Sequence, residues 1–223
     1  MYGFDYGREF LKWVAIITMT IDHIGAVLYP ELRILRFVGR IAFPIFAYLL
    51  ILGMENTKNV RNYAVRLFAF AVISQIPFFL AHDYAAFESL NIFFTLGLGL
   101  VFVYYFQKAS ILSFIPLLVS FVIHFDYGIY GLALIGCMAL LRRNTKLGAV
   151  LIVLLNCLFL FPFSSQFLSL VALPLIVLHD TGYLSMVKDY AEDYKIPLWR
   201  KYFFYVYYPL HLLLLYLINT VYF

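Results

Sequence analysis

The stretch that decides the fold is Lys12-Trp-Val-Ala-Ile-Ile-Thr-Met-Thr-Ile-Asp22-His23-Ile-Gly25. It lies in an apolar segment, about residues 9 to 29, which is long enough to cross a bilayer as a helix because about 20 residues span the hydrocarbon core. The segment also contains a cation, a carboxylate and an imidazole, and each of them costs about 2 to 4 kcal/mol in hydrocarbon. Ionisable groups at such positions face a protein interior or a wet cavity, so the stretch predicts a functional site inside a membrane protein.

The spacing of the ionisable residues places two of them on one helix face. Lys12 and His23 are eleven residues apart, which on an α-helix leaves them about 20° apart in azimuth and about 16 Å apart along the axis. That face presents a cation near one membrane surface and a titratable base deep inside. Asp22 points about 100° away from His23 and is not expected to orient its ring. Two interpretations of His23 remain open, a hydrogen bond between helices and acid–base catalysis.

The composition is that of a multi-pass membrane protein. The 223 residues are 65% hydrophobic and 13% charged, with a mean hydropathy of +0.91, whereas about a quarter of the residues of a soluble domain are charged. The net charge of +4 is interpreted as loop charge that sets membrane topology, and nucleic acid is not expected as a partner. Cys137 and Cys157 lie in apolar runs without metal-like spacing, so both are expected to pack as small hydrophobic residues and no metal site is predicted.

Apolar runs separated by charged or Gly- and Pro-containing breaks predict an all-α polytopic integral membrane protein with about nine transmembrane helices. The predicted helices cover about residues 9–29, 34–54, 63–82, 92–107, 110–124, 127–141, 147–161, 166–179 and 202–221. No internal repeat, low-complexity tract or linker divides the sequence, so residues 1–223 are expected to form a single transmembrane domain.

The distribution of Lys and Arg among the short loops predicts the orientation in the cell membrane, because these residues favour cytoplasmic loops. With the N-terminus inside, the eleven cytoplasmic loop cations are Arg8, Lys58, Arg61, Lys108, Arg142, Arg143, Lys146, Lys188, Lys195, Arg200 and Lys201. The outer loops then contain only Arg33 and Arg36. The sequence therefore predicts a cytoplasmic N-terminus and an external C-terminus, with membrane lipid around the helices.

Several polar residues lie deep inside other apolar runs. Arg40 needs a carboxylate or a ligand as its partner, and Asp22, Glu31 and Asp126 are the candidates on that side of the membrane. Pro44 cannot donate a hydrogen bond to the carbonyl of Arg40, so a kink is expected at this turn. The residues expected to line a shared cavity or substrate site are Asp22, Arg40, Gln75, Asn91, Tyr207 and His211.

No motif of a soluble enzyme is present, because the sequence contains no Walker loop and no HExxH, GxSxG or CxxC pattern. The lack of an ATP-binding loop argues against a primary pump. Two non-enzymatic alternatives remain. In a transporter or flippase, Lys12, Arg40 and His23 would line a substrate path, although the internal repeats that transporters usually carry are not seen. In an assembly factor, the buried polar groups would only join helices.

The same residues carry a resemblance to known families. Lys12, ten intervening residues and His23 match the Arg/Lys-x10-His pattern in the first transmembrane helix of acyltransferase-3-type membrane acyltransferases. An ordered set of blocks from about residue 9 to residue 219 resembles the TraX family, which is named for the conjugation protein that N-acetylates F-type pilin. The blocks are Lys12-Trp13, Asp22-His23-Ile24-Gly25, Gly39-Arg40-Ile41-Ala42-Phe43-Pro44-Ile45-Phe46, Arg66-Leu67, Ser74-Gln75-Ile76-Pro77-Phe78, Asn91-Ile92-Phe93-Phe94-Thr95-Leu96, Asp126-Tyr127-Gly128 and residues 205–211.

The resemblance implies an acetyl-CoA-dependent membrane O- or N-acetyltransferase, which moves an acetyl group from cytoplasmic acetyl-CoA to an acceptor on the outer side. By motif position His23 would be the catalytic base and Lys12 a contact to the donor. Acyl transfer needs a base with a pKa near neutrality, and histidine is the usual choice. The acceptor would be an amine or hydroxyl of a peptide, such as a pilin-like N-terminus, of a sugar or of a small amine. Direct transfer and an acyl-histidine intermediate are both open.

The donor sets further requirements on the chain. The phosphates of acetyl-CoA require cations at the cytoplasmic mouth, and its thin pantetheine arm requires a tunnel toward mid-membrane. The cations expected to bind the donor are Lys12, Arg66, Arg142, Arg143 and Lys146. Lys12 stands where many acyltransferase-3 members have Arg, which keeps the charge but loses bidentate phosphate geometry.

Overall fold

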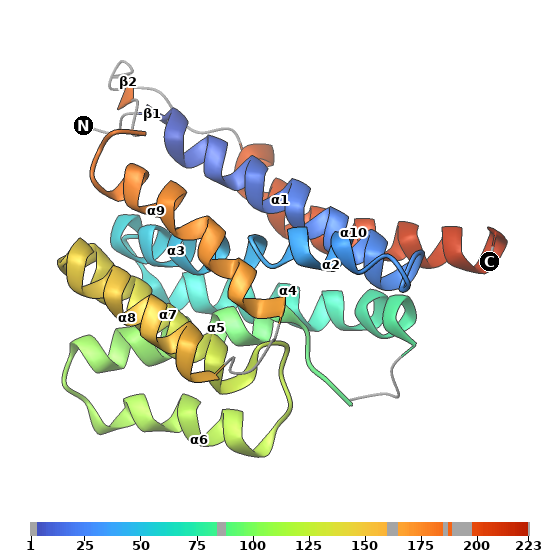
Figure 1. The fold of residues 1–223 in the computed structure, drawn as a ribbon. Coiled ribbons are helices and arrows are strands. Elements are labelled where there is room, and N and C mark those ends of the chain that lie inside the picture. Colours follow the sequence, from blue (N-terminus) through green and yellow to red (C-terminus); the bar gives the residue numbers. More distant parts are fainter. Residues whose placement is uncertain (1–3, 84–87, 160–164, 185–186, 189–197, 223) are drawn as a thin grey trace.

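The computed structural model describes residues 4–83, 88–159, 165–184, 187–188 and 198–222, which form a bundle of helices (Figure 1). The α-helices are α1 (Tyr6–Val27), α2 (Arg33–Gly39), α3 (Ala42–Asn56), α4 (Val60–His82), α5 (Ile92–Gln107), α6 (Phe114–Val122), α7 (Gly128–Arg143), α8 (Thr145–Phe159), α9 (Ala172–Asp180) and α10 (Leu198–Tyr222). Two 3-10 helices, η1 (Ile111–Ser113) and η2 (Ser165–Val171), lead into α6 and α9. A two-residue antiparallel ladder joins β1 (Phe4–Asp5) to β2 (Val187–Lys188). The all-α class predicted from the sequence is confirmed.

Side-chain caps and a proline set the helix boundaries that matter for the interior. Asp5, Asn59 and Asn91 each accept a hydrogen bond from a first-turn backbone N–H of α1, α4 and α5, which would otherwise lack a partner. The kink expected near Arg40 is confirmed, because the helix breaks between α2 and α3 at this residue. Pro44 lies in the first turn of α3, where its missing N–H costs no helical hydrogen bond.

The nine predicted segments are largely helical where the structure describes them, with residues 160 and 161 of the segment 147–161 outside the described residues. The expectation of about nine transmembrane helices was wrong by the criterion of length. Among the described residues, four helices are long and apolar enough to cross a membrane. They are Tyr6–Val27, Arg33–Glu55 across the kink, Val60–His82 and Tyr202–Tyr222. The segments Ile92–Gln107, Ile111–Val122, Thr145–Leu158 and Phe167–Asp180 are apolar but shorter. They fall short because a straight span of the hydrocarbon core needs about 20 residues.

Helix α3 is at the centre of the bundle. Its side chains Ile45, Tyr48 and Ile51 are fully buried, and it packs against α1, α5, α7 and α9. Helices α1 and α10 lie side by side along one edge, while α6 lies at the opposite edge (Figure 1). Helices α7 and α8 approach closely, since a Cβ atom at Gly148 would lie 2.2 Å from the Cα atom of Leu141. This arrangement places α1, α3, α4 and α10 around the interior described below.

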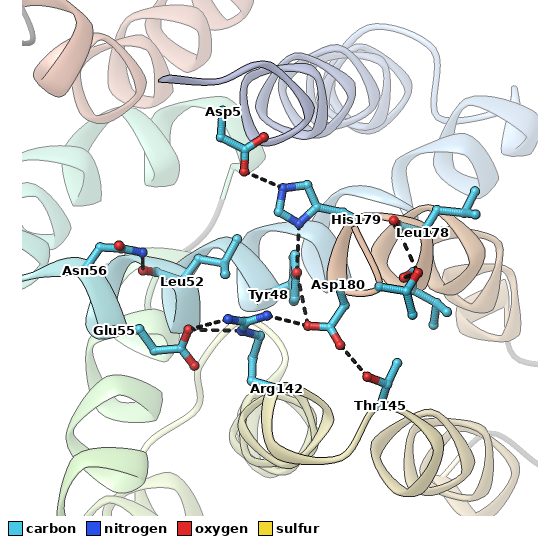
Figure 2. Close-up of polar contacts among 12 residues, drawn as sticks. Asp5, Tyr48, Leu52, Glu55, Asn56, Arg142, Thr145, Leu178, His179 and Asp180 are labelled. Atoms are coloured by element: carbon cyan, nitrogen blue, oxygen red, sulfur yellow. Dashed lines mark hydrogen bonds and ion pairs between the residues drawn. The ribbon is translucent and has the colours of Figure 1, made fainter. Parts of the chain in front are cut away.

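An ionic cluster joins three helices at the end of the bundle where α1 begins, which we call the N-terminal end (Figure 2). Arg142 at the end of α7 pairs with Glu55 of α3 at 2.9 Å and with Asp180 of α9 at 2.6 Å. Thr145, the first residue of α8, donates to the other oxygen of Asp180 at 2.6 Å. The Asp180 side chain is 4% exposed. Because water hardly reaches its carboxylate, the ion pair and the hydrogen bonds must stabilise the charge.

A second set of contacts extends the cluster to the start of the chain (Figure 2). The phenol oxygen of Tyr48 lies 2.9 Å from His179 Nδ1 and 3.4 Å from Asp180. His179 Nε2 lies 2.9 Å from the carboxylate of Asp5, the residue that caps α1. The starts of α1 and α8 and the ends of α3, α7 and α9 therefore meet at the same end, as a chain running back and forth requires.

We expect Arg142→Ala to destabilise the fold by about 2 kcal/mol or more, because it leaves the buried carboxylate of Asp180 without its cation. The thermal unfolding midpoint of the detergent-purified protein measures the effect. Arg143→Ala is the matched control, since Arg143 is the next residue and is exposed. Equal midpoints for the two variants would show that the cluster adds no stability.

Candidate functional site

The interior contains a cavity of about 620 Å³. Its wall includes side chains of α1, α3, α4, α5 and α10 and of the turn before α7. Along α1 the lining residues run from Arg8 to His23, which corresponds to about 22 Å at the helical rise per residue. Thr57 and Lys58, in the loop after α3, also line it. The cavity thus extends from the N-terminal end of the bundle to the buried imidazole of His23.

The mouth of this cavity is rich in cations. Arg8, Lys12, Lys58 and Arg66 line it, and Lys12 Nζ lies 2.5 Å from Glu9 Oε1. The Nε atoms of Arg8 and Arg66 are buried, and neither has a hydrogen-bond partner among the described residues. Unsatisfied cationic donors are costly in a protein interior, so the mouth is suited to an anionic ligand.

Aromatic rings hold two of these cations in place. The guanidinium of Arg66 lies 5.3 Å from the ring centroid of Tyr63 and 5.4 Å from that of Tyr205. Lys12 Nζ lies 5.2 Å from the ring centroid of Phe204. Such cation–π contacts orient a charge without neutralising it; Lys12 is also paired with Glu9, whereas the Nε of Arg66 has no hydrogen-bond partner among the described residues.

At the deep end, His23 is held by a second histidine. His23 Nδ1 lies 2.8 Å from His211 Nε2, and His211 Nδ1 lies 2.9 Å from the carbonyl oxygen of Tyr207. A carbonyl can only accept, so His211 Nδ1 carries its proton and Nε2 of the neutral ring accepts. His23 Nδ1 is then the donor of the pair, and its Nε2 carries the lone pair. His23 lines the cavity, so the arrangement presents a base to the interior.

Asp22 lies beside this base but is bound to another group. Its Oδ2 accepts a hydrogen bond of 2.5 Å from Arg36 Nη1, and Arg36 Nη1 also lies 3.2 Å from the backbone oxygen of Asp22. Its side chain fits against Gly39, where an added Cβ would lie 2.0 Å from Oδ1. Arg36, which was counted as an outer-loop cation, is therefore a structural partner of Asp22.

Four of the predicted site residues line the cavity, namely Lys12, Asp22, His23 and Arg66. The predicted donor-binding residues Arg142, Arg143 and Lys146 do not. Arg142 is bound in the ionic cluster, and Arg143 and Lys146 are exposed beside it. These three cations therefore lie outside the cavity, because loop cations on the same side of the membrane need not line the same opening.

Five other predicted residues, Arg40, Gln75, Asn91, Tyr207 and His211, are not among the cavity-lining residues. Asn91 Nδ2 donates to Gln75 Oε1 at 2.6 Å, and Gln75 Nε2 donates to the carbonyl of Ser89 at 2.9 Å, so these two amides join α4 to the start of α5. Tyr207 Oη lies 2.8 Å from Thr20 Oγ1, which joins α10 to α1.

Arg40 lacks the carboxylate partner that was expected. Among the described residues it forms no ion pair with Asp22, Glu31 or Asp126, and its guanidinium interacts instead with the phenol of Tyr127. Tyr127 itself stacks on Phe43, with ring centroids 3.9 Å apart. Arg40 therefore supports the deep wall of the cavity from behind.

Sequence reasoning missed several residues of the deep wall. Tyr208 and Asp126 line the cavity, and the Tyr208 hydroxyl is buried without a hydrogen-bond partner in the described part of the chain. Both residues lie in blocks that carry the family resemblance, which was the available signal. His82, whose ring centroid lies 5.7 Å from that of His23, belongs to no such block, and only the fold brings it here.

The fold and this cavity define a helical membrane protein with several ionisable side chains in a mainly apolar interior. A family model described as TraX protein matches residues 7–219, and the chain belongs to the TraX family. No solved structure matches the chain.

Three relatives show how far the similarity extends. An uncharacterized protein of Rickettsia prowazekii, RP591, is 38% identical over 48% of this chain and 40% of its own length. The probable fimbrial assembly protein FimC of Dichelobacter nodosus is 32% identical over 56% of this chain and 59% of its own length. Protein TraX of Escherichia coli K12 is 33% identical over 33% of this chain and 30% of its own length. The matched regions thus span from under a third to about three fifths of these relatives.

Asp126, in the turn between α6 and α7, is a buried acid at the cavity wall. Thr95 Oγ1 donates to its backbone oxygen. Burial raises the pKa of the Asp126 carboxyl to about 6; the nearby Asp22 carboxylate adds to this rise, whereas Arg40 and Arg36 oppose it. The folded state therefore binds a proton more tightly than the unfolded state. The stability linked to this group is greatest at acidic pH and is lost as the pH rises through about 6.

We expect Asp126→Asn, which stays neutral, to raise the unfolding midpoint relative to the wild type by more at pH 8 than at pH 5. Thermal unfolding in detergent at both pH values measures this difference. Asp83→Asn is the control, because it removes an exposed carboxylate. A gain for Asp126→Asn that is the same at both pH values would contradict the assignment.

Proposed function

We propose that this protein is a transmembrane acetyltransferase that moves an acetyl group from acetyl-CoA to an amine or hydroxyl acceptor on the other side of the membrane. The observation that carries the proposal is the single cavity that joins a cationic mouth to a buried base. Acyl transfer from a long anionic thioester needs cations to bind its phosphates and a base near its reacting carbonyl. The cations and the base must be separated by about the length of the thioester's arm.

The dimensions of the cavity suit the donor. Its phosphates would contact Arg8, Lys12, Lys58 and Arg66 at the mouth, where two buried guanidinium donors lack partners among the described residues. Lys12 and His23 are about 16 Å apart along α1, and the pantetheine arm is a thin chain of similar length. The thioester would then lie beside His23.

The deep wall supplies the groups that a direct transfer requires. His23 Nε2 takes the proton of the acceptor N–H or O–H as its nitrogen or oxygen attacks the thioester carbonyl. The Tyr208 hydroxyl, whose ring centroid lies 5.9 Å from that of His23, can donate to the oxyanion that forms. The C–S bond then breaks, and the CoA thiolate takes the proton back from His23. The products are the acetylated acceptor and free CoA.

The proposed orientation places the N-terminal end of the bundle in the cytoplasm. Arg8, Lys58, Arg142 and Arg143 all lie at this end, and loop cations favour the cytoplasmic side. The donor cavity then opens toward cytoplasmic acetyl-CoA, and α10 runs to the outer side. Of the other cytoplasmic loop cations, Lys195 lies outside the described residues.

A role in pilus assembly is the second candidate, because one relative is named a probable fimbrial assembly protein. The two candidates are compatible if the acceptor is a pilin-like N-terminus. A purely structural assembly factor or a flippase would show no acetyl transfer. Incubation of the purified protein with labelled acetyl-CoA and trialanine, glucose or putrescine tests the peptide, sugar and small-amine classes and separates these functions.

His23→Ala is expected to lower acetyl transfer by about 10²- to 10⁴-fold, the usual contribution of a positioned acid–base group. The protein should remain folded and still be stabilised by CoA. His124→Ala, which removes an exposed imidazole, is the control. His211→Ala cannot serve as one, because His211 holds the ring of His23. Activity that falls only in proportion to folded protein would exclude His23 as the base.

Lys12→Ala and Arg66→Ala are each expected to weaken acetyl-CoA binding by about 10- to 100-fold, since a hydrogen bond to a charged group contributes about 1.5 to 3 kcal/mol. The loss should shrink at high salt because phosphate contacts are partly screened. Thermal stabilisation by acetyl-CoA reports the affinity. Arg143→Ala, outside the cavity, should bind as the wild type does, and a larger effect at Arg143 would refute the placement of the donor.

A further inference from the structure

A second cavity of about 400 Å³ lies at the opposite end of the bundle. Its lining comes from the last turns of α1 and α4, from α2 and from the last turns of α10. Its polar lining consists of Arg36, His82, Asp83 and Asn219. A cation, a carboxylate, an imidazole and an amide can each donate or accept hydrogen bonds, so this cavity suits a polar group rather than an acyl chain.

A pair of histidine rings in contact links the linings of the two cavities. His23 lines the first cavity and His82 lines the second, and their ring centroids are 5.7 Å apart at an interplanar angle of 83°. Next to them, Arg36 lines the second cavity and binds Asp22, which lines the first. The base of the first cavity is therefore in contact with a ring that lines the second.

His82 is placed so that displacement of its ring is feasible. It lies in the last turn of α4, is half-buried, and its Nδ1 lies 3.0 Å from the carbonyl oxygen of Phe78 one turn earlier. A side chain at a helix end can change rotamer without moving the helices that it joins. A change of the His82 rotamer would move its ring away from the contact with His23.

We propose that the second cavity is the acceptor site, a proposal that rests on the acetyltransferase function above. It binds the polar end of an acceptor that presents an amine or a hydroxyl, and His82 forms the wall that this group passes to reach His23. Donor and acceptor then approach the base from opposite ends of the bundle. The acceptor's amine or hydroxyl reaches past His82, and the acetyl group leaves through the second cavity bound to the acceptor.

The test blocks the second cavity after the protein has folded. In a Cys137→Ala/Cys157→Ala background, Ala26→Cys places a thiol on the cavity wall, and methanethiosulfonate ethylsulfonate then fills the space. Leu32→Cys is the matched control, because Leu32 is exposed nearby and does not line the cavity. Transfer to trialanine, glucose and putrescine and thermal stabilisation by acetyl-CoA are measured before and after labelling.

Labelling of Ala26→Cys is expected to lower transfer at least tenfold while stabilisation by acetyl-CoA is unchanged, and labelling of Leu32→Cys should change neither. Full transfer by labelled Ala26→Cys overturns the proposal and leaves the acetyltransferase function intact. A label that also abolishes stabilisation by acetyl-CoA overturns it too, because the second cavity is then not separate from the donor site. If the unlabelled protein neither transfers acetyl groups nor is stabilised by acetyl-CoA, the acetyltransferase function itself fails.

Discussion

The hydrogen bond between His23 and His211 is the contact on which the interior of this protein depends. An imidazole in an apolar helix is costly unless a neighbouring helix satisfies it, and His23 finds that partner on α10. The contact fixes the rotation of α1 against α10. It thereby directs one helix face, with Lys12 near its start, into the cavity, and it leaves the second nitrogen of His23 as a base.

The sequence predicted the helices better than their relation to the membrane. Hydropathy located each apolar segment, and Pro44 marked the kink, because both signals are local. Hydropathy did not show that α5, α7 and α8, with 16, 16 and 15 residues, fall short of a full span. Helices α5 and α7 are largely covered by other helices, whereas α8 exposes apolar side chains such as Val150 and Leu154, and composition alone does not distinguish these two surroundings.

The predictions of the site also differ between those that depend on a single segment and those that depend on contacts between segments. Lys12 and His23 line one cavity, as helical geometry within one segment predicted without knowledge of neighbours. Arg142 lies outside it because its partners, Glu55 and Asp180, come from other segments. His82 was missed for the same reason. A buried polar residue in a membrane protein shows in its sequence that it needs a partner, but only the fold identifies that partner.

The large separation in the sequence between His23 and His211 has a consequence for biosynthesis. His23 and His211 are separated by 188 positions, and Asp5 and His179 by 174. During translation α1 is therefore inserted before His179 and His211 have been synthesised. Until α10 follows, the imidazole of His23 has no hydrogen bond from that helix. The contact between His23 and His211 forms only after α10 is inserted. Chains released early would keep an unsatisfied α1, a feature that membrane quality-control proteases can recognise.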